Sequence, residues 1–364
     1  MPITPGTGRL AADSYECFRG SFRRGYLIAE NGMIVEEGEG PCPEPTDIKV
    51  ALFPGAVNAH THCADYGLEV PDGLSIEELV APPDGLKHKF LASAPPEFVS
   101  DCMQRFAADS FGYGAATFID FREGGAEGCR LLRESVPDAM IMGRPISKEF
   151  DPEEMEALML WADGIGLPSV SDMPMGYVEA VADFARERKV PFALHASERV
   201  REDIDFILSL DPAFIVHMSE ADDSDFLKCA EAEVPIVVCP GSNAYFGIDP
   251  PLARMEACGV TMALGTDNGM LRVPDLAAEA NLFVRAMAKQ GGDSASVFGT
   301  FSSLNSKLLN QNIRISEAIQ GQCLAVPFEG EPSAESIFRV GAPSFPLTRK
   351  RGGLHGVQEH TRSH

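Results

Sequence analysis

The sequence has little basic charge and no long hydrophobic run. Lys and Arg number 30 against 54 Asp and Glu, which gives a formal net charge of −24. Nucleic-acid binding relies on clustered cationic side chains, so this balance argues against a nucleic-acid partner. No stretch approaches the roughly 18 apolar residues of a membrane helix, and the first residues show no apolar signal core. We therefore expect a cytoplasmic protein with no membrane partner.

Paired cysteines are also missing from the sequence. The nine cysteines are scattered along the chain, and no two of them form a C-x-x-C pair. This spacing predicts neither a disulfide framework nor a thiolate zinc site. Reduced thiols are the expected state of cysteines in a cytosolic protein.

From residue 50 onward, short apolar runs alternate with amphipathic segments, which predicts eight β-strands that are each followed by helix-like sequence. The runs cover residues 50–60, 116–121, 139–146, 163–168, 191–196, 213–218, 235–240 and 260–267. Their spacing of about 27 residues is close to the roughly 31 residues per unit of a (β/α)8 TIM barrel. A doubly wound open sheet is the rival α/β fold, but no Gly-rich dinucleotide turn opens the first unit.

Both ends of the chain show the pattern of a small β unit. Asn31-Gly32 lies between two apolar runs, a combination that strongly favours a type I′ hairpin. The last part of the chain returns to short apolar runs. The sequence therefore predicts a sandwich-like β appendage made of residues 1–50 and 325–364, attached to a barrel of residues 51–324.

Four histidines and one aspartate fall at the ends of predicted barrel strands. His60 and His62 end the first strand, and residues i and i+2 of a strand point to the same side. His195 and His217 fall near the ends of the fifth and sixth strands, and Asp267 ends the eighth. Because barrel active sites lie at the carboxyl ends of the strands, we expect all five side chains to face one pocket.

This set of side chains predicts a metal site. Neutral imidazoles and a carboxylate suit Zn²⁺ or Fe²⁺ and leave a coordination position open for water. Any single histidine is better explained as an ordinary core or surface residue. Four of them at strand ends, with an aspartate at the matching place, favour a metal. We expect one divalent metal ion, with zinc preferred over iron, and no other cofactor.

The motifs around these residues resemble those of the amidohydrolase superfamily. They are FPGAVNAHTH, HASE, CPGSN followed by FGIDPPLARMEACGV, and LGTDN. The chain is most similar to the branch that contains cytosine deaminases, S-adenosylhomocysteine deaminases and chlorohydrolases. The resemblance implies one metal bound by His60, His62, His195 and Asp267.

The resemblance also implies three catalytic roles. Asp267 would accept a proton from the metal-bound water, Glu198 would shuttle protons, and His217 would orient the water or the tetrahedral oxyanion. A glutamate just after a strand is a charge at a helix start about as often as it is a proton shuttle. A helix-start position is therefore the alternative for Glu198. Binuclear relatives carry a bridging lysine at the end of strand four. Here that strand ends GIGLPS, which favours one metal.

Candidate substrate contacts lie in two segments near the predicted barrel mouth. The long Pro- and Gly-rich segment after the first strand contains Asp65, Lys87 and His88, and loops of this kind often close on substrate. Ordinary solvated positions are the alternative for these three residues. Asp120 and Arg122 end the second strand. Arg122 could bind a carboxylate or phosphate, and a simple salt bridge explains it equally well.

Together these observations predict a hydrolase that uses metal-bound hydroxide on a carbon–nitrogen bond of a small molecule. Deamination of an aminated heterocycle or nucleoside-like compound is the first hypothesis. Hydrolysis of a cyclic amide or of another leaving group is the second, and a catalytically silent metal- or ligand-binding relative is the third. A purely structural barrel would leave the histidines unexplained. The family also suggests a homo-oligomer.

Overall fold

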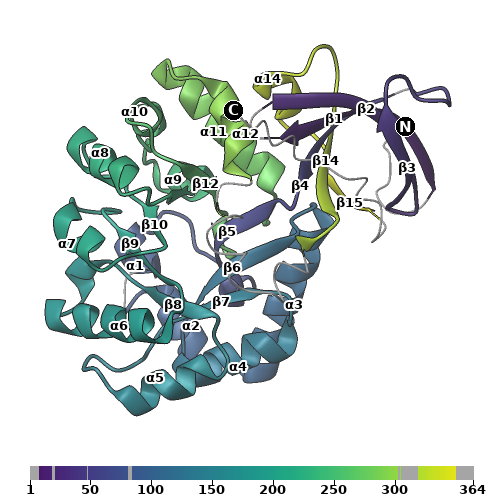
Figure 1. Ribbon diagram of the computed structural model, residues 1–364. Coiled ribbons are helices and arrows are strands. Elements are labelled where there is room, and N and C mark those ends of the chain that lie inside the picture. The colour runs from purple at the N-terminus through teal and green to yellow at the C-terminus, as the bar shows by residue number, and fades with distance from the viewer. Residues whose placement is uncertain are drawn as a thin grey trace, which may run out of the picture.

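The computed structural model describes residues 8–18, 21–46, 48–80, 84–301, 304 and 319–349. Two β structures organise them: a large curled parallel sheet surrounded by helices, and a small β unit beside it (Figure 1). No helix within these residues is both long and apolar enough to cross a bilayer. The outermost parts of the expected appendage, residues 1–7 and 350–364, lie outside the described residues.

The large sheet contains nine strands in the order β12-β11-β10-β9-β8-β7-β6-β5-β13, and every neighbouring pair is parallel. The strands are β5 (Val57–His62), β6 (Thr117–Arg122), β7 (Met140–Gly143), β8 (Gly164–Leu167), β9 (Phe192–Ala196), β10 (Phe214–His217), β11 (Ile236–Val238), β12 (Met262–Leu264) and β13 (Asp267–Asn268). With its helices, this curled sheet fits the predicted TIM-like barrel.

Side-chain hydrogen bonds connect the two ends of this sheet. Only two residues separate β12 from β13, and β13 pairs with β5, so the chain itself leads from one edge of the sheet to the other. The amide of Asn58 donates to Thr266 Oγ1 at 2.8 Å and accepts from the Thr266 N–H at 2.9 Å. Gly265 lies directly against His60, because a Cβ atom there would come within 2.8 Å of the His60 Cβ. This close approach brings the end of β12 to the site histidines.

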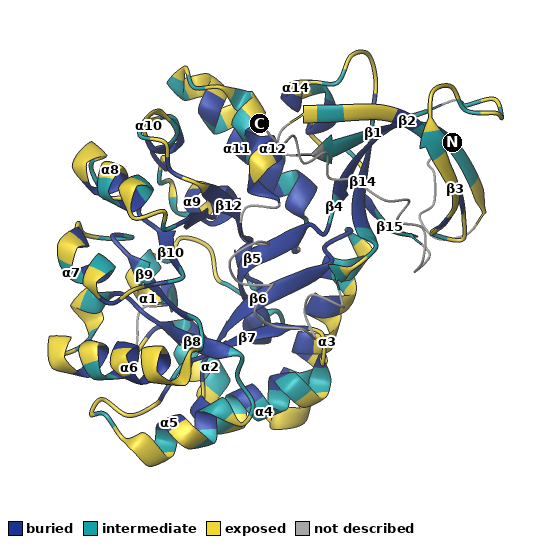
Figure 2. Ribbon diagram, in the orientation of Figure 1, coloured by how far each residue is buried: buried dark blue, intermediate teal, exposed yellow. Residues whose placement is uncertain are grey.

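Helices surround the sheet, and their buried faces turn toward the strands while their outer faces are exposed (Figure 2). In α6 (Met175–Arg188), the buried residues recur at helical spacing, as the amphipathic pattern requires. The other helices of the barrel are α3 (Pro96–Gly112), α4 (Gly125–Ser135), α5 (Pro152–Met159), α7 (Ile204–Ser209), α8 (Asp223–Glu231), α9 (Pro240–Phe246), α10 (Leu252–Ala257), α11 (Leu276–Gln290) and α12 (Val297–Thr300).

The segment after β5 is partly helical and lies at the carboxyl ends of the strands. It contains a 3-10 turn, η1 (Cys63–Asp65), followed by α1 (Ile76–Val80) and α2 (Leu86–Ser93). Two further 3-10 turns are η2 (Val170–Asp172) after β8 and η3 (Ser294–Ser296) before α12. The sequence predicted this segment as a long loop, and its helices bring specific side chains to the site.

The small unit is a closed six-stranded barrel with its own apolar core, where the sequence predicted a sandwich-like unit. Its strands are, in order around the barrel, β1 (Arg9–Phe18), β2 (Ser21–Glu30), β3 (Met33–Glu39), β15 (Phe345–Arg349), β14 (Gln322–Phe328) and β4 (Lys49–Pro54), and α14 (Ala334–Ile337) follows β14. The parallel pairing of β1 with β4 closes the ring. The hairpin at Asn31-Gly32 is as predicted, with positive φ at both residues.

One expected strand is divided between the two barrels. The apolar run at 50–60 forms β4 in the small barrel and β5 in the large sheet. Gly55, with a φ of 61°, turns the chain between them, and its N–H donates to Gln322 O at 2.8 Å. The dipeptide Pro54-Gly55 inside the run is a turn signal at the point of division, although the apolar residues on both sides of it resemble one buried strand.

Candidate metal centre

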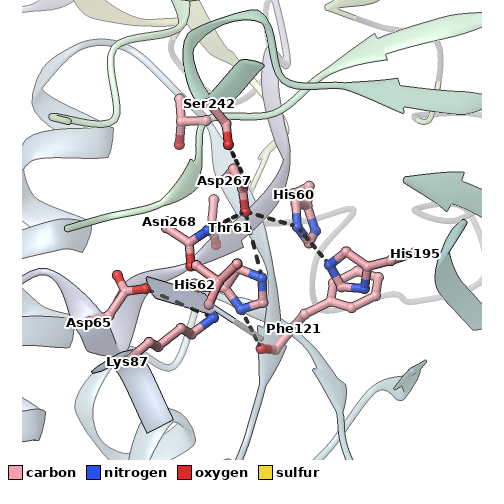
Figure 3. Close-up of polar contacts among 12 residues, drawn as sticks. His60, Thr61, His62, Asp65, Lys87, Phe121, His195, Ser242, Asp267 and Asn268 are labelled. Carbon is pink, nitrogen blue, oxygen red and sulfur yellow. Dashed lines mark hydrogen bonds and ion pairs between the residues drawn. The ribbon is translucent and has the colours of Figure 1, made fainter. Parts of the chain in front are cut away.

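Four imidazoles and one carboxylate converge near the carboxyl ends of β5, β9 and β10 and at the short strand β13. Figure 3 shows three of the imidazoles, those of His60, His62 and His195, with Asp267. The ligand atoms of His60, His62 and Asp267 lie within 4.8 Å of one another, and so do those of His60, His195 and His217. His60 Nε2 is 3.2 Å from His195 Nε2 and 3.3 Å from Asp267 Oδ1. The structure thus brings together all five residues that the sequence assigned to one pocket.

Backbone carbonyls fix the orientation of two of these imidazoles. His62 Nδ1 lies 3.1 Å from Phe121 O, and His195 Nδ1 lies 2.9 Å from Leu167 O. A carbonyl oxygen only accepts hydrogen bonds, so each Nδ1 is protonated and donates. In a neutral ring the Nε2 lone pair is then free, and in both residues Nε2 faces the cluster.

Burial keeps the central imidazole neutral. His60 is fully buried, and burial lowers its pKa to about 3, with the neighbouring imidazoles contributing in the same direction. Its Nδ1 has no hydrogen-bond partner among the described residues. A neutral His60 adds a further nitrogen ligand at the centre of the group.

Asp267 is held by two polar side chains. Ser242 Oγ donates to Asp267 Oδ2 at 2.6 Å, and Asn268 Nδ2 donates to Oδ1 at 3.0 Å. Burial raises the pKa of Asp267, but its hydrogen bond to His60 and the nearby imidazoles outweigh burial and hold that pKa well below its ordinary value. The carboxylate is therefore ionised and oriented.

The backbone is strained at two of the site residues. His217 has a φ of 75° and Asp267 a φ of 61°, although neither is glycine. Such conformations cost of order 1–3 kcal/mol each and persist where the surrounding structure enforces them. The strain directs both side chains into the same pocket.

The donor set fits a divalent metal. Imidazole nitrogens with free lone pairs and an ionised carboxylate converge in a buried place, which is the chemistry that Zn²⁺ or Fe²⁺ requires. The Nε2 atoms of His60 and His195 lie 3.2 Å apart, close enough for both to be ligands of one ion. His60, His62, His195 and Asp267 are suited to hold it, and His217 lies beside them.

Glu198 lies in the same pocket as the cluster. Its Oε1 is 3.5 Å from His217 Nε2, and burial raises its pKa. The next helix, α7, begins only at Ile204 and is capped by Asp203. Glu198 is therefore not at a helix start, which removes the alternative that the sequence left open for it.

Of the candidate substrate contacts, Lys87 and His88 line the pocket, together with Val80. Both come from the segment after β5 that was expected to cover the barrel mouth. Lys87 is buried and forms an ion pair with Glu123, with Nζ 2.7 Å from Oε1. Burial, with the charge of Lys87, lowers the pKa of His88 to about 4, and its Nε2 lies 3.1 Å from Val80 O.

The other three candidates are buried behind the pocket wall. The backbone N–H of Met270 donates to Asp65 at 3.0 Å. Asp120 accepts from the Cys63 N–H at 2.6 Å and from the Thr61 hydroxyl at 3.0 Å, so it holds the chain on both sides of His62.

Arg122 forms the salt bridge that the sequence left as an alternative. Its Nε donates to Glu123 O at 2.8 Å, and its Nη2 is 3.6 Å from the Glu123 carboxylate. Burial raises the pKa of Glu123, but Lys87, His62 and Arg122 outweigh burial and hold that pKa well below its ordinary value. Arg122 is thus engaged within the protein.

Four residues at the site were not among the sequence-based candidates: Arg144, Asp172 and Asn268 line the pocket, and Ser242 bonds to Asp267. Ser242 and Asn268 belong to the motifs CPGSN and LGTDN, which could have assigned them to the site. Arg144 lies near the end of the third predicted strand, the kind of position that identified the histidines. Nothing in the sequence distinguishes Asp172 from an ordinary surface residue.

Comparison with known proteins identifies the family. The model of the amidohydrolase family matches residues 51–310, well over half of the chain. This chain belongs to the amidohydrolase family. As a member it is a hydrolase that acts on carbon–nitrogen bonds.

Curated relatives of this amidohydrolase are known from archaea. A protein of Methanothermobacter thermautotrophicus named "Putative aminohydrolase" is 33% identical over 288 residues, which are 71% of this chain and 74% of the relative. A protein of the same name from Archaeoglobus fulgidus is 31% identical over 272 residues, 73% of this chain and 80% of the relative. An adenine deaminase of Rhizobium leguminosarum is 30% identical over 46% of this chain and 59% of the relative.

Solved structures share the fold of the amidohydrolase. An adenosine deaminase from Xanthomonas campestris with bound zinc has a TM-score of 0.64 and 17% identity, covering 92% of this chain and 90% of the other. A guanine deaminase from C. acetobutylicum with guanine in its active site has a TM-score of 0.60 and 12% identity, covering 88% and 91%. At these identities the likeness concerns the fold.

Proposed function

We propose that this amidohydrolase is a mononuclear metal-dependent deaminase of an aminated heterocycle or nucleoside-like compound. One observation carries the proposal: the carboxyl groups of Asp267 and Glu198 face one pocket beside the imidazole cluster, with Asp267 Oδ1 3.3 Å from His60 Nε2 and Glu198 Oε1 3.5 Å from His217 Nε2. Pairs of carboxyl groups whose surroundings separate their pKa values are suited to divide the work of base and acid. The deaminases among the relatives support the choice of leaving group.

A divalent metal in the site would supply a water nucleophile at neutral pH, because coordination lowers the pKa of water to about 7. Asp267 is ionised and has Oδ1 toward the imidazoles, so it accepts the proton that this water loses. His217 Nε2 lies 3.5 Å from Glu198 Oε1 at the pocket, where it could orient the water or the oxyanion.

Glu198 transfers protons to the substrate in this proposal. Burial raises its pKa, so its carboxyl group is protonated over a wider pH range than an exposed glutamate. It can therefore donate a proton to the departing amine, which leaves as ammonia, and then return to its carboxylate form.

A single metal is part of the proposal. β8 is followed by Pro168 and Ser169 at the pocket wall, and of the described residues that line the pocket the only lysine is Lys87, which is paired with Glu123. No lysine of the described pocket lining is therefore placed to bridge two metals from β8. Zinc is our first choice for the ion, and iron the second.

The experiment begins with metal analysis. The protein is purified without chelator, and metal per chain is measured by plasma mass spectrometry. We expect about one zinc or iron per chain. Two ions would contradict the mononuclear site and would favour hydrolysis of cyclic amides.

Ammonia release is then measured with adenine, guanine, cytosine, adenosine, cytidine and pterin, using the Glu198→Gln variant as a metal-loaded control. We expect at least one of these compounds to release ammonia with the wild type and far more slowly with the variant. Hydrolysis of dihydrouracil or hydantoin to an acid without ammonia release would contradict deamination and would support the cyclic-amide hypothesis.

A further inference from the structure

The pocket beside the imidazole cluster contains a guanidinium without a counter-ion. Arg144 follows β7 directly and lines the pocket together with His62 and His195. Its backbone is held on both sides: the Arg144 N–H donates to Arg122 O at 2.9 Å, and the Arg144 carbonyl accepts from the Gly125 N–H at 3.2 Å. The side chain therefore starts from a fixed point at the carboxyl end of the barrel strands.

The other cations of the pocket are paired. Lys87 Nζ lies 2.7 Å from Glu123 Oε1, and Arg199 Nη2 lies 2.6 Å from Asp172 Oδ1. Arg144 lies near both of these acidic groups, yet no ion pair or hydrogen bond joins its guanidinium to any residue in the described part of the chain. Arg144 is thus the one arginine or lysine of the described pocket lining whose side chain forms no direct ion pair, although the nearby carboxylates of Glu123 and Asp172 favour its charged form.

An unpaired cation in this place needs an explanation. The chain has 54 acidic residues, so a counter-ion for Arg144 would have been easy to supply. Burial lowers the pKa of Arg144, which means that the charged form loses hydration at the pocket wall. A partly buried charge without a partner costs stability. Charged or polar groups that lack a hydrogen-bond or ion-pair partner within the protein are typical of sites that receive a ligand.

We propose that Arg144 binds an anionic oxygen group of the substrate, a carboxylate or a phosphate attached to the ring compound. The planar guanidinium offers parallel N–H donors that match the oxygens of either group in a bidentate contact. This inference rests on the proposed function for the nature of the ring, but the anion contact itself can be measured without turnover.

The test uses equilibrium binding to metal-loaded protein by calorimetry. The probes are two matched pairs, adenosine with AMP and cytosine with cytosine-5-carboxylate, together with inorganic phosphate as a competitor. The variants are Arg144→Gln, Arg144→Lys and the control Arg285→Gln, which removes an exposed arginine on α11 far from the pocket lining.

We expect the wild type to bind the anionic member of at least one pair about 10- to 100-fold more tightly than the neutral member, as charge-assisted hydrogen bonds allow. Arg144→Gln should abolish this preference, and Arg285→Gln should retain it. If only AMP is preferred over its neutral partner and inorganic phosphate competes with it, the anionic group that Arg144 binds is a phosphate. If only cytosine-5-carboxylate is preferred over cytosine, the group is a carboxylate. Arg144→Lys should keep more of a phosphate preference than of a carboxylate preference, because lysine lacks the planar fork.

Thermal unfolding of the same variants separates a ligand contact from a structural role. Because Arg144 has no partner within the described protein, Arg144→Gln should leave the Tm unchanged or raise it. A lower Tm, an unchanged preference in Arg144→Gln, or no preference for any anionic probe in the wild type would overturn the inference.

The outcomes also separate this inference from the proposed function. If Arg144→Gln loses anion binding while no ring compound releases ammonia with the wild type, the anion site stands and deamination is wrong. If adenosine and AMP release ammonia equally well with the wild type and with Arg144→Gln, deamination stands and the role of Arg144 is wrong.

Discussion

The two sides of the candidate metal centre differ in how their charges are compensated. On the side of β5 and β6, His62 contacts Glu123, whose carboxylate is 2.7 Å from the buried Lys87 ammonium. On the side of β9 and β10, the ion-pair contact of Glu198 within the described residues is with His217 Nε2, at 3.5 Å. One side is a closed network of opposite charges, and the other is an acid facing an imidazole.

This difference indicates different tasks for the two sides. A buried charge that is paired and hydrogen-bonded stays in one protonation state, which suits a group that positions a ligand. A buried carboxyl with a raised pKa changes protonation more readily near neutral pH, which suits a group that moves protons. We therefore assign to Glu123 and Lys87 the support of His62, and to Glu198 and His217 the transfer of protons.

Asp267 belongs to both sides, so its loss should have the largest effect. Asp267→Ala removes a metal ligand and the proton acceptor together, and we expect activity to fall by about 10⁴-fold or more. Metal content by plasma mass spectrometry should fall with it, while the circular dichroism spectrum is retained. Asp249→Ala, which removes an exposed carboxylate paired with Lys289, is the control and should keep both metal and activity. Full activity in Asp267→Ala would contradict the proposed mechanism.

Glu198→Gln tests proton transfer on the β9–β10 side. Glutamine preserves the shape of the side chain but transfers no proton, so we expect kcat to fall by about 10²- to 10⁴-fold. Metal content should remain that of the wild type, because the group does not support the ion. Loss of metal in step with activity would show instead that Glu198 supports the ion, and the assignment of proton transfer to this residue would be wrong.

Glu123→Gln removes the ion pair between Glu123 and Lys87 on the β5–β6 side. The change leaves the buried Lys87 with only Asp65, whose Oδ2 is 3.9 Å from Nζ. We expect stability to fall by roughly 3–5 kcal/mol and metal affinity to fall about 10- to 100-fold. Urea unfolding and competition with a chelator measure the two effects.

The double variant Glu123→Gln/Lys87→Met should recover much of the stability, because it also removes the buried ammonium of Lys87 that has lost its partner Glu123. It should not recover the metal affinity, since the acceptor beside His62 Nδ1 remains altered. Equal losses in the single and double variants would show that the ion pair is not what stabilises this side.

A buried carboxyl group away from both sides gives the smallest effect and a reference for pH studies. Burial raises the pKa of Glu279 to about 7, although Oε1 is 3.0 Å from Arg272 Nη1 and Oε2 accepts from the Gly241 N–H at 2.7 Å. A raised pKa means that the folded state favours the protonated form. Its contribution to stability is complete below the ordinary glutamate pKa and is lost as the pH rises through about 7.

We therefore expect wild-type stability to decline by roughly 2 kcal/mol relative to Glu279→Gln between pH 5 and pH 8, since one unit of pKa shift corresponds to about 1.4 kcal/mol. Denaturant unfolding of both proteins at several pH values measures the difference. A constant difference across this range would contradict the raised pKa.

The sequence predicted the convergence of the four histidines and Asp267 better than the positions of the candidate substrate residues, for a physical reason. Parallel barrel strands end on one side, so a residue at a strand end is assigned to the pocket by chain position alone. Whether a charged residue near that end faces the pocket depends on its partners. Asp120 bonds to the backbone beside His62, and Arg122 bonds to Glu123, so both lie behind the wall.

Apolar alternation with helical segments, together with the spacing of His60, His62, His195, His217 and Asp267, determined the barrel and the composition of its metal cluster. These properties are local or periodic along the chain, and the sequence contains them directly. Only the tertiary structure decided which charges are paired. It attached Lys87 to Glu123 and left Arg144 without a direct ion pair among the described residues. Such pairings join residues distant in the chain, and they depend on distances that composition and spacing do not fix.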